Sequence, residues 1–172
     1  MKTIISICFA SLFAMAIFTT SCKKIKYSEI GESITLEKNL IGSWKLDSIV
    51  EVDQLAVDKG FPAFVQKLNI TALFPYANMT ASFTDGGTGK AGSYVFTNPG
   101  NAPLFFAPSG NWNYFDNAGP VRIRLAGTNR TDSLDFAKAF RVSDNKLSIR
   151  YNRRFYANNK IFLYYDFNFS RN

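Results

Sequence analysis

Residues 40–46 read Leu-Ile-Gly-Ser-Trp-Lys-Leu, and the character of the chain changes at this stretch. A glycine two positions before a tryptophan lets the backbone pass close to a neighbouring strand while the indole ring turns inward. From Gly42 the side chains alternate with a period of two, which is typical of a β-strand with one buried face. One face would carry Trp44, Leu46, Ser48 and Val50, and the other Lys45, Asp47, Ile49 and Glu51. We expect a long first strand that opens the folded domain and closes one end of a barrel or sandwich.

The residues before this strand have the pattern of an export signal. A short basic start at residues 1–3 is followed by an apolar run over residues 4–18, and small residues lead to Cys22. The run is too short and too poorly flanked for a transmembrane helix, so it predicts a cleaved signal peptide. The cysteine, followed by Lys23 and Lys24, resembles the lipobox of bacterial lipoproteins, although Thr19 stands where leucine is usual. The resemblance implies that Cys22 is diacylated and becomes the mature N-terminus. The alternative is an ordinary signal peptide with a coincidental cysteine.

These signals divide the chain into three parts. They are a lipoprotein signal peptide over residues 1–21, a lipidated cysteine and flexible tether over 22–38, and a folded domain over 39–172. Two acyl chains hold a protein on a bilayer stably, whereas one holds it only marginally. We therefore expect a lipid-anchored protein of the cell envelope, at the outer membrane. Because Cys8 leaves with the signal peptide, the mature domain has no internal disulfide and depends on burial for its stability.

The chain is basic, with 20 Lys and Arg against 13 Asp and Glu and a formal charge of +7. Such a surface favours anionic lipid headgroups, anionic glycans or nucleic acid. The charges are dispersed and alternate with apolar residues, as on the solvated face of strands, and the sequence contains no nucleic-acid-binding motif. We expect the membrane to be a partner through the lipid anchor, and we expect no nucleic-acid partner.

The sequence argues against several kinds of enzyme site. It contains no histidine, which removes imidazole bases, the usual serine triad and the commonest zinc ligand. All four glutamates lie at or before Glu51, so a catalytic carboxylate pair would need aspartates, most of which lie in turn-like contexts. The glycine-rich residues 85–89 lack the following helix of a phosphate-binding loop. We expect no enzymatic activity, no catalytic residues, no metal site and no cofactor.

Alternating runs and tight turns predict further strands downstream. Residues 79–84 and 91–97 would form a hairpin around Asp85 and Gly86, and the Gly-x-Trp spacing recurs at Gly110 and Trp112. Closing such a meander removes its sheet edges. The pattern therefore predicts an all-β fold, an up-and-down antiparallel barrel of about eight strands with one short helical insertion.

Two segments depart from this pattern. Apolar residues fall at helical spacing over residues 61–73, where Pro62 suits a first turn, and they predict a helix. This segment would lie over the barrel mouth as a lid, plug one end as core, or be a loop with another strand. The Pro-rich loop over residues 98–108 carries Phe105 and Phe106, which either pack inward as a plug or face a partner. Inward packing is the favoured interpretation.

The chain resembles the lipocalin-like, calycin-type domains of small envelope lipoproteins of Gram-negative bacteria, particularly the Bacteroidota kind. The resemblance rests on the lipobox, the tether, residues 40–46, 83–87 and 110–112, and the terminal set of alternating strands. It implies a calycin-type barrel in which Trp44 closes the base beneath a basic residue near the end of the last strand, for which Arg171 is the candidate. Gly42, Gly110 and Trp112 would likewise belong to the structural motif. The Thr-Asp-Tyr motif of transport lipocalins is missing, and the resemblance implies no catalytic residues.

We expect the barrel to bind a small apolar or amphipathic ligand. Because Trp44 blocks the end at which the first strand begins, the opposite end would be the mouth, with Phe61, Phe64, Val65 and Leu68 as ligand contacts. The alternative is a filled barrel, a structural or interaction lipoprotein that contacts an envelope protein or glycan. Eight strands enclose either a core filled by side chains or one small ligand, so the barrel interior decides between the two interpretations.

Overall fold

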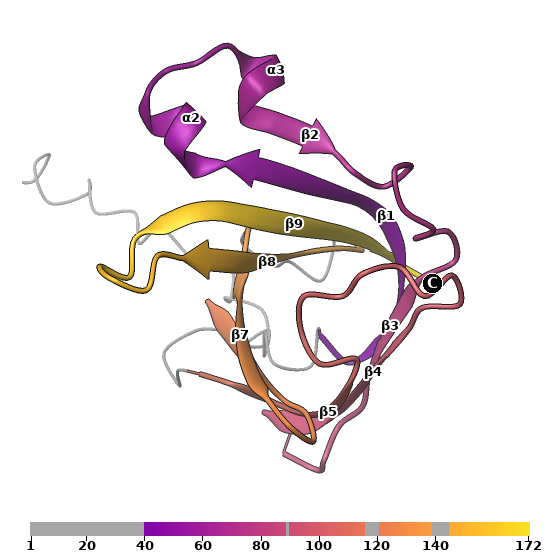
Figure 1. Cartoon of the computed structure of the whole chain (residues 1–172). Coiled ribbons are helices and arrows are strands. Elements are labelled where there is room, and N and C mark those ends of the chain that lie inside the picture. The colour runs from indigo at the N-terminus through magenta and orange to yellow at the C-terminus, as the bar shows by residue number, and fades with distance from the viewer. Residues whose placement is uncertain (1–39, 89, 116–120, 139–144) are drawn as a thin grey trace, which may run out of the picture. The chain divides into compact units, whose positions relative to one another are not determined.

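The computed structural model describes residues 40–88, 90–115, 121–138 and 145–172. The predicted signal peptide, Cys22 and the predicted tether lie outside these residues. The all-β prediction is confirmed, because β1 and β3 to β9 form a closed antiparallel barrel of eight strands (Figure 1). The elements are β1 (Gly42–Asp53), α2 (Gln54–Asp58), α3 (Ala63–Gln66), β2 (Lys67–Asn69), β3 (Thr80–Phe83), β4 (Ala91–Thr97), β5 (Ser109–Tyr114), β6 (Arg122–Ala126), β7 (Thr131–Phe136), β8 (Lys146–Arg154) and β9 (Ile161–Arg171). Neither α2 nor α3 has the length or the apolar character needed to span a membrane.

Strand β1 is the element on which closure of the barrel depends. From β3 to β9 each strand pairs with the next, and β1 pairs with both β3 and β9. Its pairing with β9 runs along nearly its whole length, starting with Trp44 opposite Arg171. On its other edge β3 covers only residues 42–45, and the short β2 covers residues 50–52. The predicted hairpin over residues 79–97 is confirmed as β3 and β4.

The alternation predicted for β1 holds through Leu46 and is wrong beyond it. The register with β9 shifts between Leu46 and Ser48, which makes Asp47 the extra residue of a β-bulge. Because side chains alternate with a period of two, one inserted residue moves all later side chains to the other face. Ile49, predicted on the outer face, is therefore fully buried, while Ser48 and Val50 are only half-buried.

The helix predicted over residues 61–73 is wrong in its extent. Only one turn forms, α3, in which the N–H groups of Val65 and Gln66 donate to the carbonyl of Pro62. Strand β2 follows immediately. Because β3 pairs only with residues 42–45, the backbone groups of the last part of β1 need other partners, and β2 supplies them at residues 50–52. The hydrogen bonds of a paired strand outweigh the helical spacing of the apolar residues. Helix α2 lies outside every predicted element and begins after Asp53, whose carboxylate accepts from the N–H of Ala56 at 2.9 Å.

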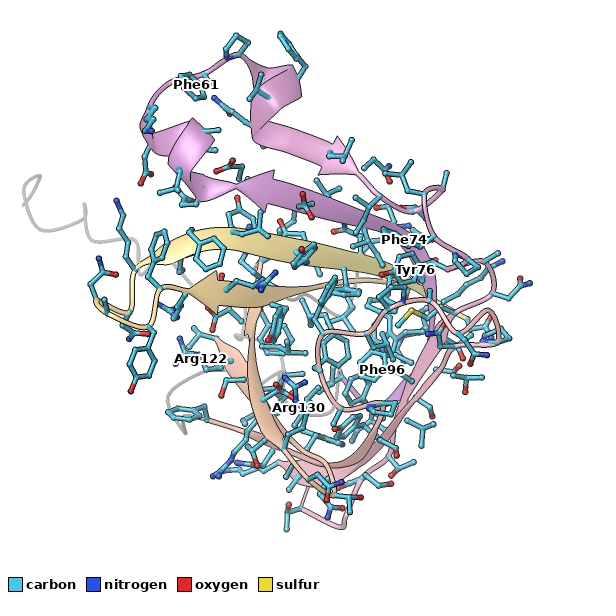
Figure 2. The ribbon with its side chains drawn as sticks, viewed as in Figure 1. Phe61, Phe74, Tyr76, Phe96, Arg122 and Arg130 are labelled. Atoms are coloured by element: carbon cyan, nitrogen blue, oxygen red, sulfur yellow. The ribbon has the colours of Figure 1, made fainter. Side chains whose placement is uncertain are left out.

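Aromatic side chains pack together in the barrel interior (Figure 2). Rings in the buried cluster belong to Trp44, Tyr76, Phe83, Tyr94, Phe96, Phe106, Trp112, Tyr165, Phe167 and Phe169. The loop over residues 98–108 joins β4 to β5 at the end opposite Trp44 and brings Phe106 into this cluster, where the side chain is 2% exposed. The ring centroid of Phe106 lies 4.8 Å from that of Phe96. Phe105 stacks on Tyr165 with centroids 4.0 Å apart. The predicted inward packing of this loop is confirmed.

Candidate functional site

Trp44 and Arg171 close the base of the barrel. The guanidinium carbon of Arg171 lies 4.4 Å from the ring centroid of Trp44, and its Nη1 donates to the carbonyl of Ile41 at 3.1 Å. The indole Nε1 donates to the carbonyl of Leu40 at 2.9 Å. Gly42 has φ of +132°, and a Cβ at this position would lie 2.7 Å from Arg171 Nη1. The first Gly-x-Trp motif therefore lies at the base of the barrel, where the start of β1 packs against Arg171 at the end of β9.

The second Gly-x-Trp motif packs three strands together. Trp112 is fully buried and its Nε1 donates to the carbonyl of Thr84 at 3.0 Å. Gly110 lies where β5 approaches the end of β6, and a Cβ there would meet the carbonyl oxygen of Ala126 at 2.0 Å. Such a distance excludes any side chain at Gly110. Gly110 and Trp112 therefore serve the close packing of these strands.

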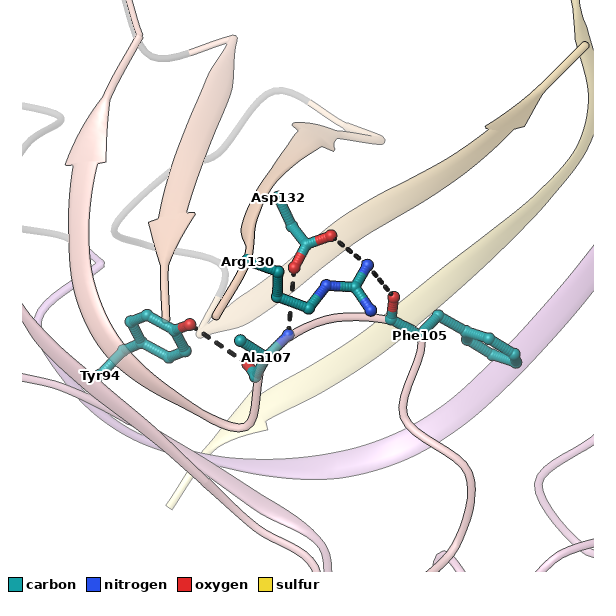
Figure 3. A network of polar contacts seen from close by, with 5 residues as sticks. All are labelled: Tyr94, Phe105, Ala107, Arg130 and Asp132. Atoms are coloured by element: carbon teal, nitrogen blue, oxygen red, sulfur yellow. Dashed lines mark hydrogen bonds and ion pairs between the residues drawn. The ribbon is translucent and has the colours of Figure 1, made fainter. Parts of the chain in front are cut away.

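A polar network holds the loop over residues 98–108 in the mouth of the barrel (Figure 3). Asp132, at the start of β7, accepts from the N–H of Ala107 at 3.1 Å and forms an ion pair with Arg130. Arg130 also donates to the carbonyl of Phe105 at 2.9 Å, and the Tyr94 hydroxyl donates to the carbonyl of Ala107 at 3.2 Å. We call these five residues the loop clamp.

Burial sets the electrostatics of the loop clamp. Asp132 is only 8% exposed, and a carboxylate at that depth needs hydrogen-bonding partners, which Arg130 and Ala107 supply. Burial, followed by the charge of Asp132, raises the pKa of Tyr94 to about 12, so its hydroxyl remains a donor at neutral pH. The sequence carries one signal of this network. Period-two spacing places Asp132 on the same face as Leu134, which indicates an inward-facing acid.

A polar groove lies on the outer wall of the barrel where β7 and β8 separate. Among the described residues these strands pair only at Asp135 with Arg150 and at Phe136 with Ile149. Beside this junction a hollow of about 380 Å³, the wall groove, is lined by Arg122, Ser133, Asp135, Asn152, Arg154 and Asn159. The carboxylate of Asp135 accepts from Nε of Arg122 and from Nδ2 of Asn152. The wall groove thus offers guanidinium donors beside carboxylate and amide acceptors.

The four predicted ligand contacts lie outside the barrel interior. They belong to the segment formed by α2, α3 and β2, residues 54–69, which we call the flap. Phe61 is 48%, Phe64 83%, Val65 46% and Leu68 51% exposed. They are not part of the buried cluster, and Figure 2 shows Phe61 on the flap, away from the rings around Phe96. Cys22, the predicted lipid anchor, lies outside the described residues.

Within the described ranges, no group of three acidic, cysteine or histidine side chains is placed to hold a metal ion. The chain matches no protein-family model, no curated protein and no solved structure.

Proposed function

We propose that this chain is a membrane-anchored lipoprotein of the cell envelope whose filled barrel is an interaction module that contacts an envelope glycan or protein through its outer surface. The observation that carries the proposal is the occupied interior. Phe106, brought in by the loop over residues 98–108, packs against Phe96 and Phe167, with ring centroids 4.8 and 5.3 Å away. The chain's own rings therefore occupy the volume that an apolar ligand would need.

Energetics favour the filled interior over a carrier that exchanges ligands. A ligand that entered the barrel would have to displace Phe106 and separate Phe105 from Tyr165. Each large apolar side chain exposed in this way costs about 1.5–3 kcal/mol. It would also have to break the loop clamp, whose Asp132 is buried. These combined costs oppose binding of a small apolar ligand inside the barrel.

The wall groove gives the interaction module its most specific polar surface. Arg122 and Arg154 supply donors, and Asp135 and Asn152 supply acceptors, within one hollow of about 380 Å³. Sugar rings present neighbouring hydroxyls that donate and accept at once, and they match such a mixed set of planar groups. A saccharide of the envelope is accordingly the partner class that we assign to the wall groove.

The interior is tested with the purified domain, native mass spectrometry and an environment-sensitive apolar dye. We expect no co-purified lipid and no saturable dye binding by the wild type. Phe106→Ala, which opens space among the rings, should gain dye binding, whereas the exposed control Phe155→Ala should not. Saturable one-to-one binding by the wild type would overturn the filled-barrel proposal and restore the ligand-binding interpretation.

The wall groove is tested by titrating soluble envelope polysaccharide fragments into the same domain. Arg154→Ala should weaken binding about tenfold, because it removes a charged donor from the groove. Arg124→Ala is the matched control, since Arg124 is an exposed arginine on β6 outside the groove. Equal affinities for the two variants would exclude the groove as the saccharide site.

A further inference from the structure

We propose that the flap docks on the anionic surface of the bilayer and inserts Phe64 among the lipid headgroups, with Phe61, Val65 and Leu68 around it. The proposal rests on the proposed membrane anchoring of this chain and adds a second contact with the same membrane. Its starting observation is that four large apolar side chains within eight residues are each at least 46% exposed. Single exposed apolar residues are common on soluble proteins, but a group of them on one protruding segment marks an interaction surface.

The flap presents these side chains from an ordered backbone. Asp53 caps α2, Ala56 is buried beneath it, and β2 is paired with β1. The N–H of Phe61 donates to the carbonyl of Ala56 at 3.0 Å, which ties the tip of the flap to α2. The backbone of the flap is thus held on both sides of the tip, and the apolar side chains point outward from a supported turn.

The charges beside the apolar group favour an anionic lipid surface as the occupant. The Nζ of Lys59 lies 6.0 Å from the ring centroid of Phe61, and Lys67 is exposed at the start of β2. The one acidic residue of the flap, Asp58, comes just before Lys59, where it accepts from Gln54 and is paired with Lys160 at 3.0 Å. An apolar tip with a basic rim suits the boundary between acyl chains and anionic headgroups, where each basic residue adds attraction.

The tether is long enough to permit this contact. The flap follows the end of β1 that lies opposite Trp44, and a strand of 12 residues spans about 40 Å. The 18 peptide steps from Cys22 to Leu40 span at most about 60 Å when fully extended. A chain anchored at Cys22 can therefore bring the far end of β1, and the flap with it, down to the bilayer.

The test uses the mature chain with Cys22→Ser, so that no acyl group contributes to binding, and vesicles sedimented with bound protein. One vesicle set contains phosphatidylglycerol and phosphatidylethanolamine, and the other contains phosphatidylcholine alone. We expect binding to the anionic set that weakens with salt, at least fivefold weaker binding for Phe64→Ser, and weaker binding with a shallower salt dependence for Lys67→Glu. Tyr156→Ser is the matched control, since Tyr156 is a fully exposed ring on another loop, at 107% exposure. It should bind as the parent chain does.

Three results would overturn the membrane assignment. They are no binding to anionic vesicles by the Cys22→Ser chain, equal binding by the Phe64→Ser and Tyr156→Ser variants, and self-association that Phe64→Ser abolishes. Because Phe64 is 83% exposed, Phe64→Ser should leave the unfolding midpoint unchanged, so lost binding cannot be attributed to unfolding. The proposed function fails in different assays, namely dye binding by the wild-type barrel and acyl labelling at Cys22.

Discussion

Trp44 connects three segments of the chain at the base of the barrel. Its ring lies under Arg171 from the end of β9, and its indole N–H holds the carbonyl of Leu40, just before β1. Arg171 in turn donates to the carbonyl of Ile41, so the guanidinium ties the last strand to the start of the first. A single side chain of this size removes about 150–250 Å² of surface from water. Trp44 is therefore a core residue on which closure of the barrel depends.

We expect Trp44→Ala to lower the free energy of unfolding by about 3–5 kcal/mol, because it removes a buried ring and leaves a cavity under Arg171. Urea unfolding monitored by circular dichroism measures the change. Val121→Ala, at an exposed position, is the control and should cost less than about 0.5 kcal/mol. A Trp44→Ala domain of normal stability would show that the base is held by other contacts.

The stability of the domain should fall at alkaline pH through Tyr94. Its pKa is raised from 10.0 to about 12 in the folded protein, so folding favours the neutral phenol. The contribution of the neutral Tyr94 phenol to the free energy of unfolding is complete below pH 10. It is lost between pH 10 and pH 12, because the unfolded chain releases this proton more readily. Over this pH range the free energy of unfolding should fall by about 2–3 kcal/mol. Tyr94→Phe should cost about 1 kcal/mol at neutral pH, through the lost hydrogen bond to Ala107, and should flatten the decline above pH 10.

Denaturant unfolding at a series of pH values compares the two proteins. Burial also raises the pKa values of Tyr76 and Tyr165, so part of the alkaline decline should remain in Tyr94→Phe. Parallel pH profiles for the wild type and the variant would contradict the role given to Tyr94.

At the scale of elements, the loop over residues 98–108 behaves as part of the core. It carries two phenylalanines into the barrel mouth, and the loop clamp holds its backbone through Ala107 and Phe105. A loop with buried backbone groups needs such partners, since each unpaired N–H or carbonyl costs about 1–3 kcal/mol. Asp132 and Arg130 supply these hydrogen-bonding partners to the backbone of the loop.

We expect Asp132→Ala to destabilise the domain by about 2–4 kcal/mol, because it leaves Arg130 and the buried N–H of Ala107 without their carboxylate. Hydrogen exchange should rise first over residues 98–108, which would show that the loop is released from the mouth. Asp47→Ala removes an acid from the exposed ion pair with Lys146 and should cost less than about 1 kcal/mol. Uniform exchange throughout the barrel in Asp132→Ala would mean that the clamp does not act on the loop in particular.

At the scale of the whole molecule, the domain combines an interior rich in aromatic rings with an outer surface of two kinds. The wall groove is polar and lined by charged residues, while the flap is apolar and bordered by Lys59 and Lys67. A lipid anchor would confine both surfaces to the neighbourhood of one membrane. Confinement raises the local concentration of partners there, so weak surface contacts suffice for function.

Replacing the anchor tests this arrangement. We expect Cys22→Ser to abolish labelling by a radioactive fatty acid and to move the protein from the membrane fraction to the soluble fraction after a high-salt wash. The wash removes the weaker contact proposed for the flap, so the acyl chains alone are assayed. Cys8→Ser, in the predicted signal peptide, is the control and should leave labelling and fractionation as in the wild type. Persistent labelling of the Cys22→Ser protein would reject the lipoprotein assignment.

Local patterns in the sequence correctly predicted an all-β meander that closes into a barrel and a buried Trp44, and they favoured inward packing of Phe106. These features follow from local patterns, because a period of two and turn residues are encoded by neighbours in the chain. Export and lipidation rest on local patterns as well, and they stay predictions until Cys22 is tested.

Four features required the three-dimensional structure: the side-chain alternation of β1 after Asp47, the pairing of β2, the loop clamp and the packing of the aromatic rings inside the barrel. Each depends on partners that are far apart in the sequence. Asp132 meets Ala107 across 25 residues, and β1 meets β9 across more than 100. Local preferences do not specify which strand supplies the hydrogen bonds that another strand needs. Residues 67–69 therefore pair with residues 50–52 of β1, although the apolar residues over 61–73 have helical spacing. Whether aromatic rings fill a barrel depends on how all its walls pack together, and no single stretch of sequence encodes that.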